Sequence, residues 1–493
     1  GLPLPFLHRP IGLEGGWEDL RLRYDEMVYS WRYGARYIGV FRVLIIGLFL
    51  LWLPAIVQAQ VPRIQGQGTS ASGQGNAFAA QADDPSAIHY NPAGMTQLPG
   101  VQFMVGGLFS GGTTSFTSPT GVNATGTRDG SIAWPPPTHL FVTANMGSLG
   151  MTALSGMTVG IGLTSPFGSV SRYPDGGPQR FKSTFSAMPL IDIKPTMAYQ
   201  VTPDLSLGLG MDIYTFSDML GEGHFEKQFI STGAVPVLGS AGQRTELYGK
   251  GTAVGYNVSL LYTALRNADG KPVANIGLVY RNQVALPLNG AILANGVKTS
   301  DASTTFVLPQ VISGAVAIWP VRTAEREWKL ELDVDYVGWK SVRNLDIALA
   351  SGTVIPQPQN WRSTYTVMIG TEYRWLKMES LPEWEMAARA GYTNSPTQIP
   401  DVTFDPAVPS ADVHIPSVGF GLVCKEGGTI FGVRCGDFGF GPLKPKAVGL
   451  DLSYQASLYE QRTVSCGCAL ASAVNGNYRT TYHSGGVSLR VNF

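Results

Sequence analysis

Hydrophobic and polar residues alternate along many segments of this chain. Residues 487–493 carry an apolar side chain at every odd position, and the same period of two runs through 205–213, 328–336 and 450–458. Successive side chains of a β-strand point to opposite faces. Each of these segments therefore predicts a strand with one apolar and one polar face.

The alternation predicts fourteen strands in all. They span 100–109, 137–146, 157–166, 185–200, 204–216, 250–263, 273–286, 305–318, 328–340, 363–374, 384–393, 414–422, 446–460 and 481–493. Most reach the roughly 9–11 residues with which a tilted strand crosses a bilayer, whereas ordinary strands have about 5–6. A soluble sandwich would bury the apolar face. The strand lengths instead favour a transmembrane β-barrel, whose apolar face meets lipid.

The connections between these strands nearly alternate in length, as external loops and periplasmic turns do in barrels. Long links fall at 110–136, 217–249, 341–362, 394–413 and 461–480, and short turns at 201–203, 267–272 and 375–382. The link 423–445 is long where a short turn is expected. Either that turn is enlarged or the strand count is wrong by one pair there.

Charged side chains occupy the polar positions of several predicted strands. They include Lys329, Glu331, Asp333, Asp335, Glu385 and Arg389. In a membrane barrel this face lines the lumen. We expect these charges to form a solvated or paired interior rather than a site for a carboxylate.

The N-terminal region predicts export. An apolar run at 43–53 follows three arginines and precedes the small-residue sequence Val57-Gln58-Ala59. This order is typical of a secretory signal peptide, and the run is shorter than the ~20 residues of a transmembrane helix. We expect a signal peptide over 27–59, and we interpret 1–26 as an extension foreign to the natural protein.

Composition agrees with this interpretation but does not decide it. Charged residues make up 14% of the chain, against about 25% in ordinary soluble domains. Glycine is abundant, with 60 residues, and the formal net charge is zero. A neutral chain gives no reason to expect a nucleic-acid partner.

Residues 66–98 precede the first strand and lack its period. They are small, polar and rich in turn-forming residues, yet they contain Phe78, Ile88, Tyr90 and Met95. A disordered leader needs no such apolar content. Small side chains would let the segment pack in a lumen that large barrels otherwise leave as an aqueous channel.

Three motifs in this segment resemble the hatch of the FadL/TodX family of outer-membrane transporters. They are Gly75-Asn76-Ala77-Phe78, Asp83-Asp84-Pro85-Ser86-Ala87 and Asn91-Pro92-Ala93-Gly94-Met95. Residues 162–168 resemble the family's third strand, where a kink opens the wall, and 193–199, 205–208, 390–392 and Phe493 also fit. The resemblance covers roughly 65–493. The link 423–445 and residues 1–26 depart from it.

The resemblance implies an all-β fold: a 14-stranded antiparallel transmembrane barrel over 99–493, with a hatch over 60–98 inside the lumen. It implies passive uptake of long-chain fatty acids or of aromatic or aliphatic hydrocarbons across the bacterial outer membrane. No catalytic residue, cofactor or metal is implied. We expect a monomer in outer-membrane lipid, inserted by the barrel-assembly machinery through its C-terminal Phe493.

The resemblance also assigns candidate residues. The hatch or gate comprises Phe78, Asp83, Asp84, Asn91, Pro92, Ala93 and Gly94, and the lateral opening comprises Pro166, Phe167 and Gly168. Proline removes a ladder hydrogen bond and glycine tolerates unusual backbone angles. Pro166 and Gly168 are therefore suited to opening a gap in the wall.

Four cysteines remain. Disulfides are the default in exported proteins, and a bond between Cys424 and Cys435 would close the link 423–445. Cys466 and Cys468 are too close in sequence for an easy bridge, and a four-thiolate metal site is the alternative.

Two other functions stay open. A general porin for polar solutes would lack a hatch that fills the lumen. An outer-membrane hydrolase would have to bring His139, His224, His414 or His483 together with a serine or aspartate from distant loops.

Overall fold

The computed structural model describes residues 63–128, 133, 138–219, 223–430, 432–436, 444–465 and 471–493. The expected signal peptide, the N-terminal extension and the pair Cys466 and Cys468 lie outside these ranges. Within the described ranges, no helix has the length and apolarity needed to cross a membrane.

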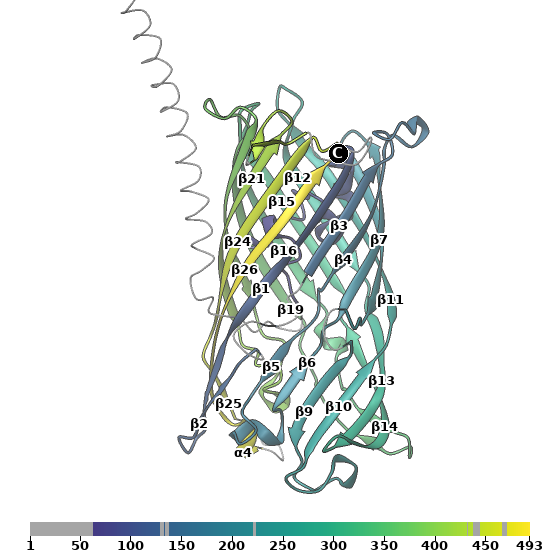
Figure 1. Cartoon of the computed structure of the whole chain (residues 1–493), viewed down its shortest axis with the longest axis vertical. Helices are drawn as coiled ribbons and strands as arrows, with labels where there is room; N and C mark the ends of the chain where they lie inside the picture. The colour runs from purple at the N-terminus through teal and green to yellow at the C-terminus, as the bar shows by residue number, and fades with distance from the viewer. Residues whose placement is uncertain are drawn as a thin grey trace, which may run out of the picture. The chain divides into compact units, whose positions relative to one another are not determined.

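Fourteen antiparallel strands form a closed barrel (Figure 1). In order they are β1 (Val101–Thr117), β3 (Thr138–Asn145), β4 (Met157–Thr164), β7 (Ile191–Thr202), β8 (Leu205–Thr215), β11 (Ala253–Arg266), β12 (Pro272–Arg281), β15 (Val311–Arg322), β16 (Arg326–Val337), β19 (Thr364–Trp375), β20 (Trp384–Ser395), β21 (Val413–Lys425), β24 (Ala447–Tyr459) and β26 (Gly476–Asn492). The pairing of β1 with β26 closes the barrel. The end of the barrel that carries the long connections is called the loop end. There the short strands β2 (Asn123–Gly126) and β25 (Arg462–Val464) extend the sheet. The predicted 14-stranded barrel is confirmed.

The two faces of the barrel strands differ as a membrane requires. On β16, Leu332 is 47% exposed, while its neighbours Glu331 and Asp333 are buried. On β8, Leu209 and Met211 are exposed and Asp212 is buried. Apolar side chains thus form the outer face and charged ones the inner face, which is the inverse of a soluble protein.

A second sheet extends the barrel at its loop end, at the bottom of Figure 1. Its strands are β5 (Val170–Arg172), β6 (Phe185–Ala187), β9 (Phe225–Ile230), β10 (Arg244–Lys250), β13 (Val284–Ala294), β14 (Val297–Leu308), β17 (Ile347–Leu349) and β18 (Val354–Ile355). The sequence analysis missed this sheet. The predicted strand 273–286 ran from β12 into β13, and 305–318 ran from β14 into β15. Alternation continues across these breaks because both sheets have one buried face.

The long link after β21 is an enlarged turn. β21 pairs directly with β24, so the strand count is correct there. Within the turn, β22 (Thr429–Ile430) and β23 (Val433–Arg434) form a hairpin, and a disulfide joins Cys424 to Cys435.

The remaining elements are short helices of three to six residues. The N-terminal segment contains α2 (Thr69–Ser72), α3 (Ala87–Tyr90) and η1 (Pro92–Gln97). The connections between strands contain η2 (Thr152–Leu154), η3 (Pro178–Phe181), η4 (Pro236–Leu238), η5 (Trp339–Ser341), η6 (Asp401–Thr403) and α4 (Ala471–Val474).

Glycines on the polar face of the barrel let the N-terminal segment approach the wall. A Cβ atom at Gly391 on β20 would overlap the backbone of Gln74, and one at Gly277 on β12 would overlap the carbonyl of Ala79. Gly208, Gly370 and Gly419 meet the same segment. These positions need hydrogen as a side chain because the opposing atoms are backbone.

We therefore expect Gly391→Ala to lower the free energy of unfolding by about 1–3 kcal/mol, the usual cost of overpacking. Urea unfolding of the protein in lipid vesicles measures this. Gly314→Ala on β15 is the matched control, since its nearest neighbour is the flexible end of Leu278 at 3.7 Å. Equal stability of the two variants would contradict the prediction.

Candidate functional site

Residues 63–98, here called the N-terminal segment, are buried almost throughout. Their three short helices contact β1, β4, β7, β8, β11, β21, β24 and β26. The short helices and turns bond many of the segment's amides internally but leave the consecutive amides of 78–81 to other partners, and buried amides need hydrogen bonds. The wall of the barrel supplies them.

Two carboxylates of β16 bind four consecutive amides of the segment. The amides of Phe78 and Ala79 each donate to Oδ2 of Asp333 at 3.0 Å. The amides of Ala80 and Gln81 donate to Oε1 of Glu331 at 2.6 and 3.2 Å. One carboxyl oxygen of each residue thus accepts from two consecutive amides.

Lys329 completes this contact from the same face of β16. Its Nζ donates to Oε2 of Glu331 at 2.7 Å and to the side-chain oxygens of Gln74 and Gln81 at 2.6 and 2.7 Å. A buried charge is tolerated only when paired and hydrogen-bonded. The lysine and the carboxylates meet that requirement together with the segment.

Asn91, in the predicted Asn-Pro-Ala motif, joins three parts of the structure. Its side-chain oxygen accepts from the amide of Ala93 at 3.1 Å and so caps η1. Its amide nitrogen donates to the carbonyls of Ala79 at 2.7 Å and Leu260 at 3.1 Å. The amide of Ala93 also donates to the hydroxyl of Ser259 on β11 at 2.9 Å. The motif therefore anchors the segment to β11.

The other predicted hatch residues lie in the same segment. Asp83 forms an ion pair with Arg374 of β19 at 2.8 Å. Asp84 accepts from the hydroxyls of Ser70 and Ser86 and from the amide of Ser86. Burial raises the pKa of Asp84, and these hydroxyls act in the opposite direction. Phe78 is fully buried edge-on against Tyr90, Pro92 begins η1, and Gly94 packs closely on Ala82.

β4 ends at Thr164, directly before Pro166, Phe167 and Gly168, the residues predicted to form the lateral opening. The ladders of β4 with β3 and β7 end at Leu163 and Thr164. The start of the N-terminal segment covers the next residues. The amide of Ile64 donates to the carbonyl of Pro166 at 2.8 Å, and Arg63 forms an antiparallel bridge with Phe167.

Gln67 strengthens this junction. Its side-chain oxygen accepts from the amide of Ser165, and its side-chain nitrogen donates to the carbonyl of Ser165, both at 2.9 Å. One side-chain amide thus replaces a strand neighbour at the point where β4 loses its own.

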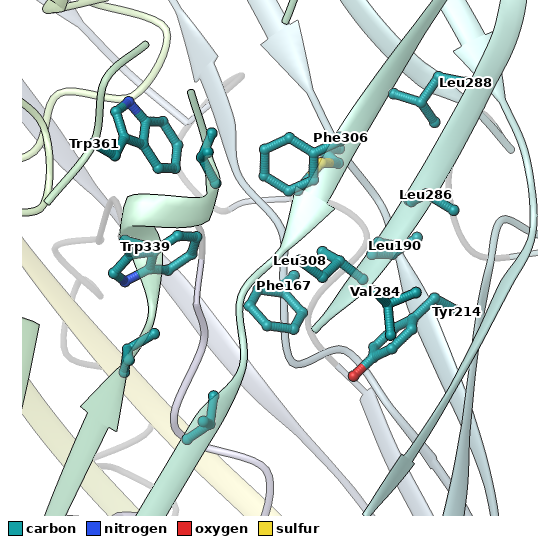
Figure 2. Close-up of a cluster of buried hydrophobic side chains, with 14 of the residues drawn as sticks. Phe167, Leu190, Tyr214, Val284, Leu286, Leu288, Phe306, Leu308, Trp339 and Trp361 are labelled. Carbon is teal, nitrogen blue, oxygen red and sulfur yellow. The ribbon is translucent and has the colours of Figure 1, made fainter. Parts of the chain in front are cut away.

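Phe167 belongs to a large cluster of buried apolar side chains (Figure 2). The cluster comprises Phe167, Met188, Leu190, Tyr214, Val284, Leu286, Leu288, Phe306, Leu308, Val311, Val337, Trp339, Val342, Trp361 and Ile399. Its aromatic rings meet at steep angles, with centroids 6.2 Å apart for Phe167 and Trp339 and 5.3 Å apart for Trp339 and Trp361. We call this set the apolar cluster.

Charged residues form the inner boundary of the apolar cluster. Arg63 pairs with Asp335 at 2.7 Å, and Arg281 pairs with Asp212 at 3.2 Å. Lys194 pairs with Asp192 and Asp212. Four members of the cluster lie within three residues of these groups in the sequence: Leu190, Tyr214, Val284 and Val337. We call the six charged residues the ionic floor.

A polar cavity of about 30 Å³ lies at the ionic floor. Its lining includes Arg63, His89, Arg281, Asp333 and Asp335. Such a volume holds about two water molecules. The N-terminal segment and the ionic floor therefore leave no room for a hydrocarbon at this point.

Sequence reasoning found the motif residues but missed the apolar cluster and the junction residues Arg63, Ile64 and Gln67. Trp339 and Trp361 carried a usable signal, because large aromatic residues are unexpected in external loops. The histidines proposed for a hydrolase lie at separate places. His414 contacts Tyr392 and Glu460, His483 contacts Tyr454, and His224 contacts Glu226.

A closed 14-stranded barrel with an apolar outer face and a charged inner face defines an integral protein of the bacterial outer membrane. The family model of the outer membrane protein transport protein (OMPP1/FadL/TodX) matches residues 55–479. The chain belongs to this family of outer-membrane transporters for hydrophobic substrates, as the sequence resemblance predicted.

Solved structures share the fold. A FadL homologue of Pseudomonas aeruginosa aligns with a TM-score of 0.63 and 16% identity over 88% of this chain and 100% of that one. The toluene transporter TodX of Pseudomonas putida aligns with 0.58 and 17% over 87% and 99%. The toluene transporter TbuX of Ralstonia pickettii gives 0.56 and 15% over 88% and 100%. No curated protein matches the sequence.

The anchoring of the N-terminal segment can be tested at Asp333. Asp333→Ala leaves the amides of Phe78 and Ala79 without their acceptor, at a cost of about 1–3 kcal/mol for each buried group. We expect hydrogen exchange of these amides to become at least roughly tenfold faster, measured by mass spectrometry of peptides covering 74–84.

Asp451→Ala is the control, because it removes another buried carboxylate, whose described partner is Arg389 at 2.7 Å. Unchanged exchange in Asp333→Ala, or equal acceleration in the control, would contradict the assignment.

Proposed function

We propose that this protein is a channel for passive uptake of hydrophobic small molecules, namely long-chain fatty acids or aromatic or aliphatic hydrocarbons. Family membership supports the general activity, and two of the similar structures are described as toluene transporters. The apolar cluster places buried side chains of the required chemistry beside the junction with the N-terminal segment.

We propose further that the N-terminal segment is a hatch inside the lumen and that cargo leaves sideways through an opening in the wall after β4. The observation that carries this proposal is the junction of Ile64 with Pro166 and of Arg63 with Phe167. Phe167 belongs to the apolar cluster, so cargo that displaces its ring acts directly on the hatch. Release then requires different contacts in two states of the hatch.

The remaining expectations follow from this mechanism. We propose that the protein is not an enzyme, that it acts as a monomer, and that its C-terminal Phe493 is read by the barrel-assembly machinery. The expected signal peptide and cleavage after Ala59 are part of the same proposal. A mature N-terminus before Gln60, found by mass spectrometry, would refute the cleavage.

Uptake itself is tested with radiolabelled palmitate and toluene, in a bacterium that lacks its own transporter of this kind and expresses the full chain. We expect uptake of at least one of them above the empty-vector rate. Passage of small sugars without either hydrophobic compound would favour a porin and overturn the proposal.

The hatch is tested by tying it to the wall. Arg63 and Phe167 are opposed in an antiparallel bridge, in which opposite Cβ atoms lie about 4.5–5.5 Å apart. We expect the double variant Arg63→Cys and Phe167→Cys to lose most uptake when oxidised and to recover it on reduction. The oxidised and reduced forms of the same double variant are compared, so the loss of the Arg63 and Phe167 side chains affects both measurements equally.

The controls are each single variant and the wild type under the same reductant, since reduction also reaches the bond between Cys424 and Cys435. Equal uptake by the cross-linked and the reduced protein would show that uptake does not require this junction to open.

A further inference from the structure

The ionic floor contains cations that a negatively charged cargo needs, but each is already bound to a carboxylate. Arg63 faces Asp335, Arg281 faces Asp212, and Lys194 lies between Asp192 and Asp212. Nη2 of Arg281 also donates to the carbonyl of His89. Each guanidinium keeps further N–H donors, but the positive charge of each cation is already compensated by a neighbouring carboxylate.

The polar cavity adds no cation to those of the ionic floor. Asp333 lines it, and Oδ1 of Asp333 has no hydrogen-bond partner among the described residues. Burial and the nearby Arg281 hold the pKa of His89 well below its ordinary value, so its ring is neutral at physiological pH. A carboxylate that reached the cavity would meet the buried carboxyl group of Asp333, a neutral imidazole and two arginines whose charges are already compensated.

Cargo cannot avoid this region. Arg63 belongs both to the ionic floor and to the bridge with Phe167 that closes the proposed exit. A molecule that crosses the junction must therefore move its whole length past Arg63. An anion would have to lose its water there, and desolvation of an unpaired charge is prohibitive.

We propose that Asp335 and Asp212 determine the charge of the cargo: by neutralising Arg63 and Arg281 they admit uncharged hydrophobic molecules and exclude carboxylates. The inference rests on the proposed function and narrows it to hydrocarbons and other neutral compounds. The two aspartates act through the arginines, so they are specificity-determining residues that need not touch the cargo.

The test uses pairs of similar shape and different charge. Toluene is compared with benzoate, and methyl palmitate with palmitate, as initial uptake at pH 7.5 by a host that lacks general porins and its own transporter. Empty-vector rates are subtracted. For the wild type we expect the neutral member of each pair to enter at least about tenfold faster, the usual effect of one hydrogen bond to a charged group.

Asp335→Asn and Asp212→Asn each release an arginine while keeping the shape of the side chain. We expect each variant to raise the ratio of carboxylate to neutral uptake by about tenfold. Asp335→Glu keeps a carboxylate beside Arg63, so we expect this variant to show the wild-type ratio of carboxylate to neutral uptake. Asp451→Asn, which frees Arg389 from one partner away from the floor, should leave the ratio unchanged. Altered mobility of unheated samples in gels confirms that each barrel is folded.

The possible outcomes distinguish a failure of this inference from a failure of the proposed function. Equal entry of both members of a pair into wild-type cells overturns the inference and leaves the channel intact. Folded Asn variants with an unchanged ratio overturn the role of the two aspartates. If no member of either pair enters above the empty vector, the proposed function itself fails.

Discussion

The N-terminal segment lies deep inside the protein without enough regular structure to satisfy its own backbone. Buried amides must find acceptors, and here the acceptors are the carboxylates of Asp333 and Glu331 and the side chain of Asn91. The dependence is mutual, because those carboxylates would be costly to bury without the amides and Lys329. The segment and the wall therefore stabilise each other as one network, and removing one member leaves the others uncompensated.

The same requirement explains the junction after β4. Residues that leave a ladder expose carbonyls and amides that lipid cannot satisfy. At Ser165 and Pro166 the partners are Gln67 and Ile64, which belong to the N-terminal segment. Because the N-terminal segment supplies these partners and Arg63 also bridges to Phe167, the position of the segment, the hydrogen bonding of the wall and the packing of Phe167 depend on one another.

The sequence predicted the barrel well because lipid on one side and charge on the other impose a period of two on every spanning strand. The second sheet was missed for the same reason, since β13 and β14 continue that period beyond the barrel. Lys329, Glu331 and Asp333 were correctly expected to be a paired interior. Their partners, the amides of 78–81, lie about 250 positions away in the sequence. A local pattern of residues does not indicate which distant segment will be in contact.

The apolar cluster was harder still, because its side chains come from connections that are separate in sequence and meet only when the loops fold. Trp339 and Trp361 follow different strands, and Phe167 follows a third. Each alone is an isolated aromatic residue in a loop. Only in the folded protein do these side chains lie together in one buried apolar cluster, as Figure 2 shows.

The contrast between the apolar cluster and the ionic floor argues for the direction in which cargo leaves. Each CH₂ group buried in the cluster contributes about 0.8 kcal/mol, and an axial route would surrender this contribution among paired charges and a cavity the size of two waters. Lipid offers the same hydrophobic environment as the cluster. In the proposed exit, a sideways step past Phe167 leads from one apolar environment to another. Opening must break the hydrogen bonds of Ile64 and Gln67 with the wall and the contacts of Arg63 with Phe167 and Asp335.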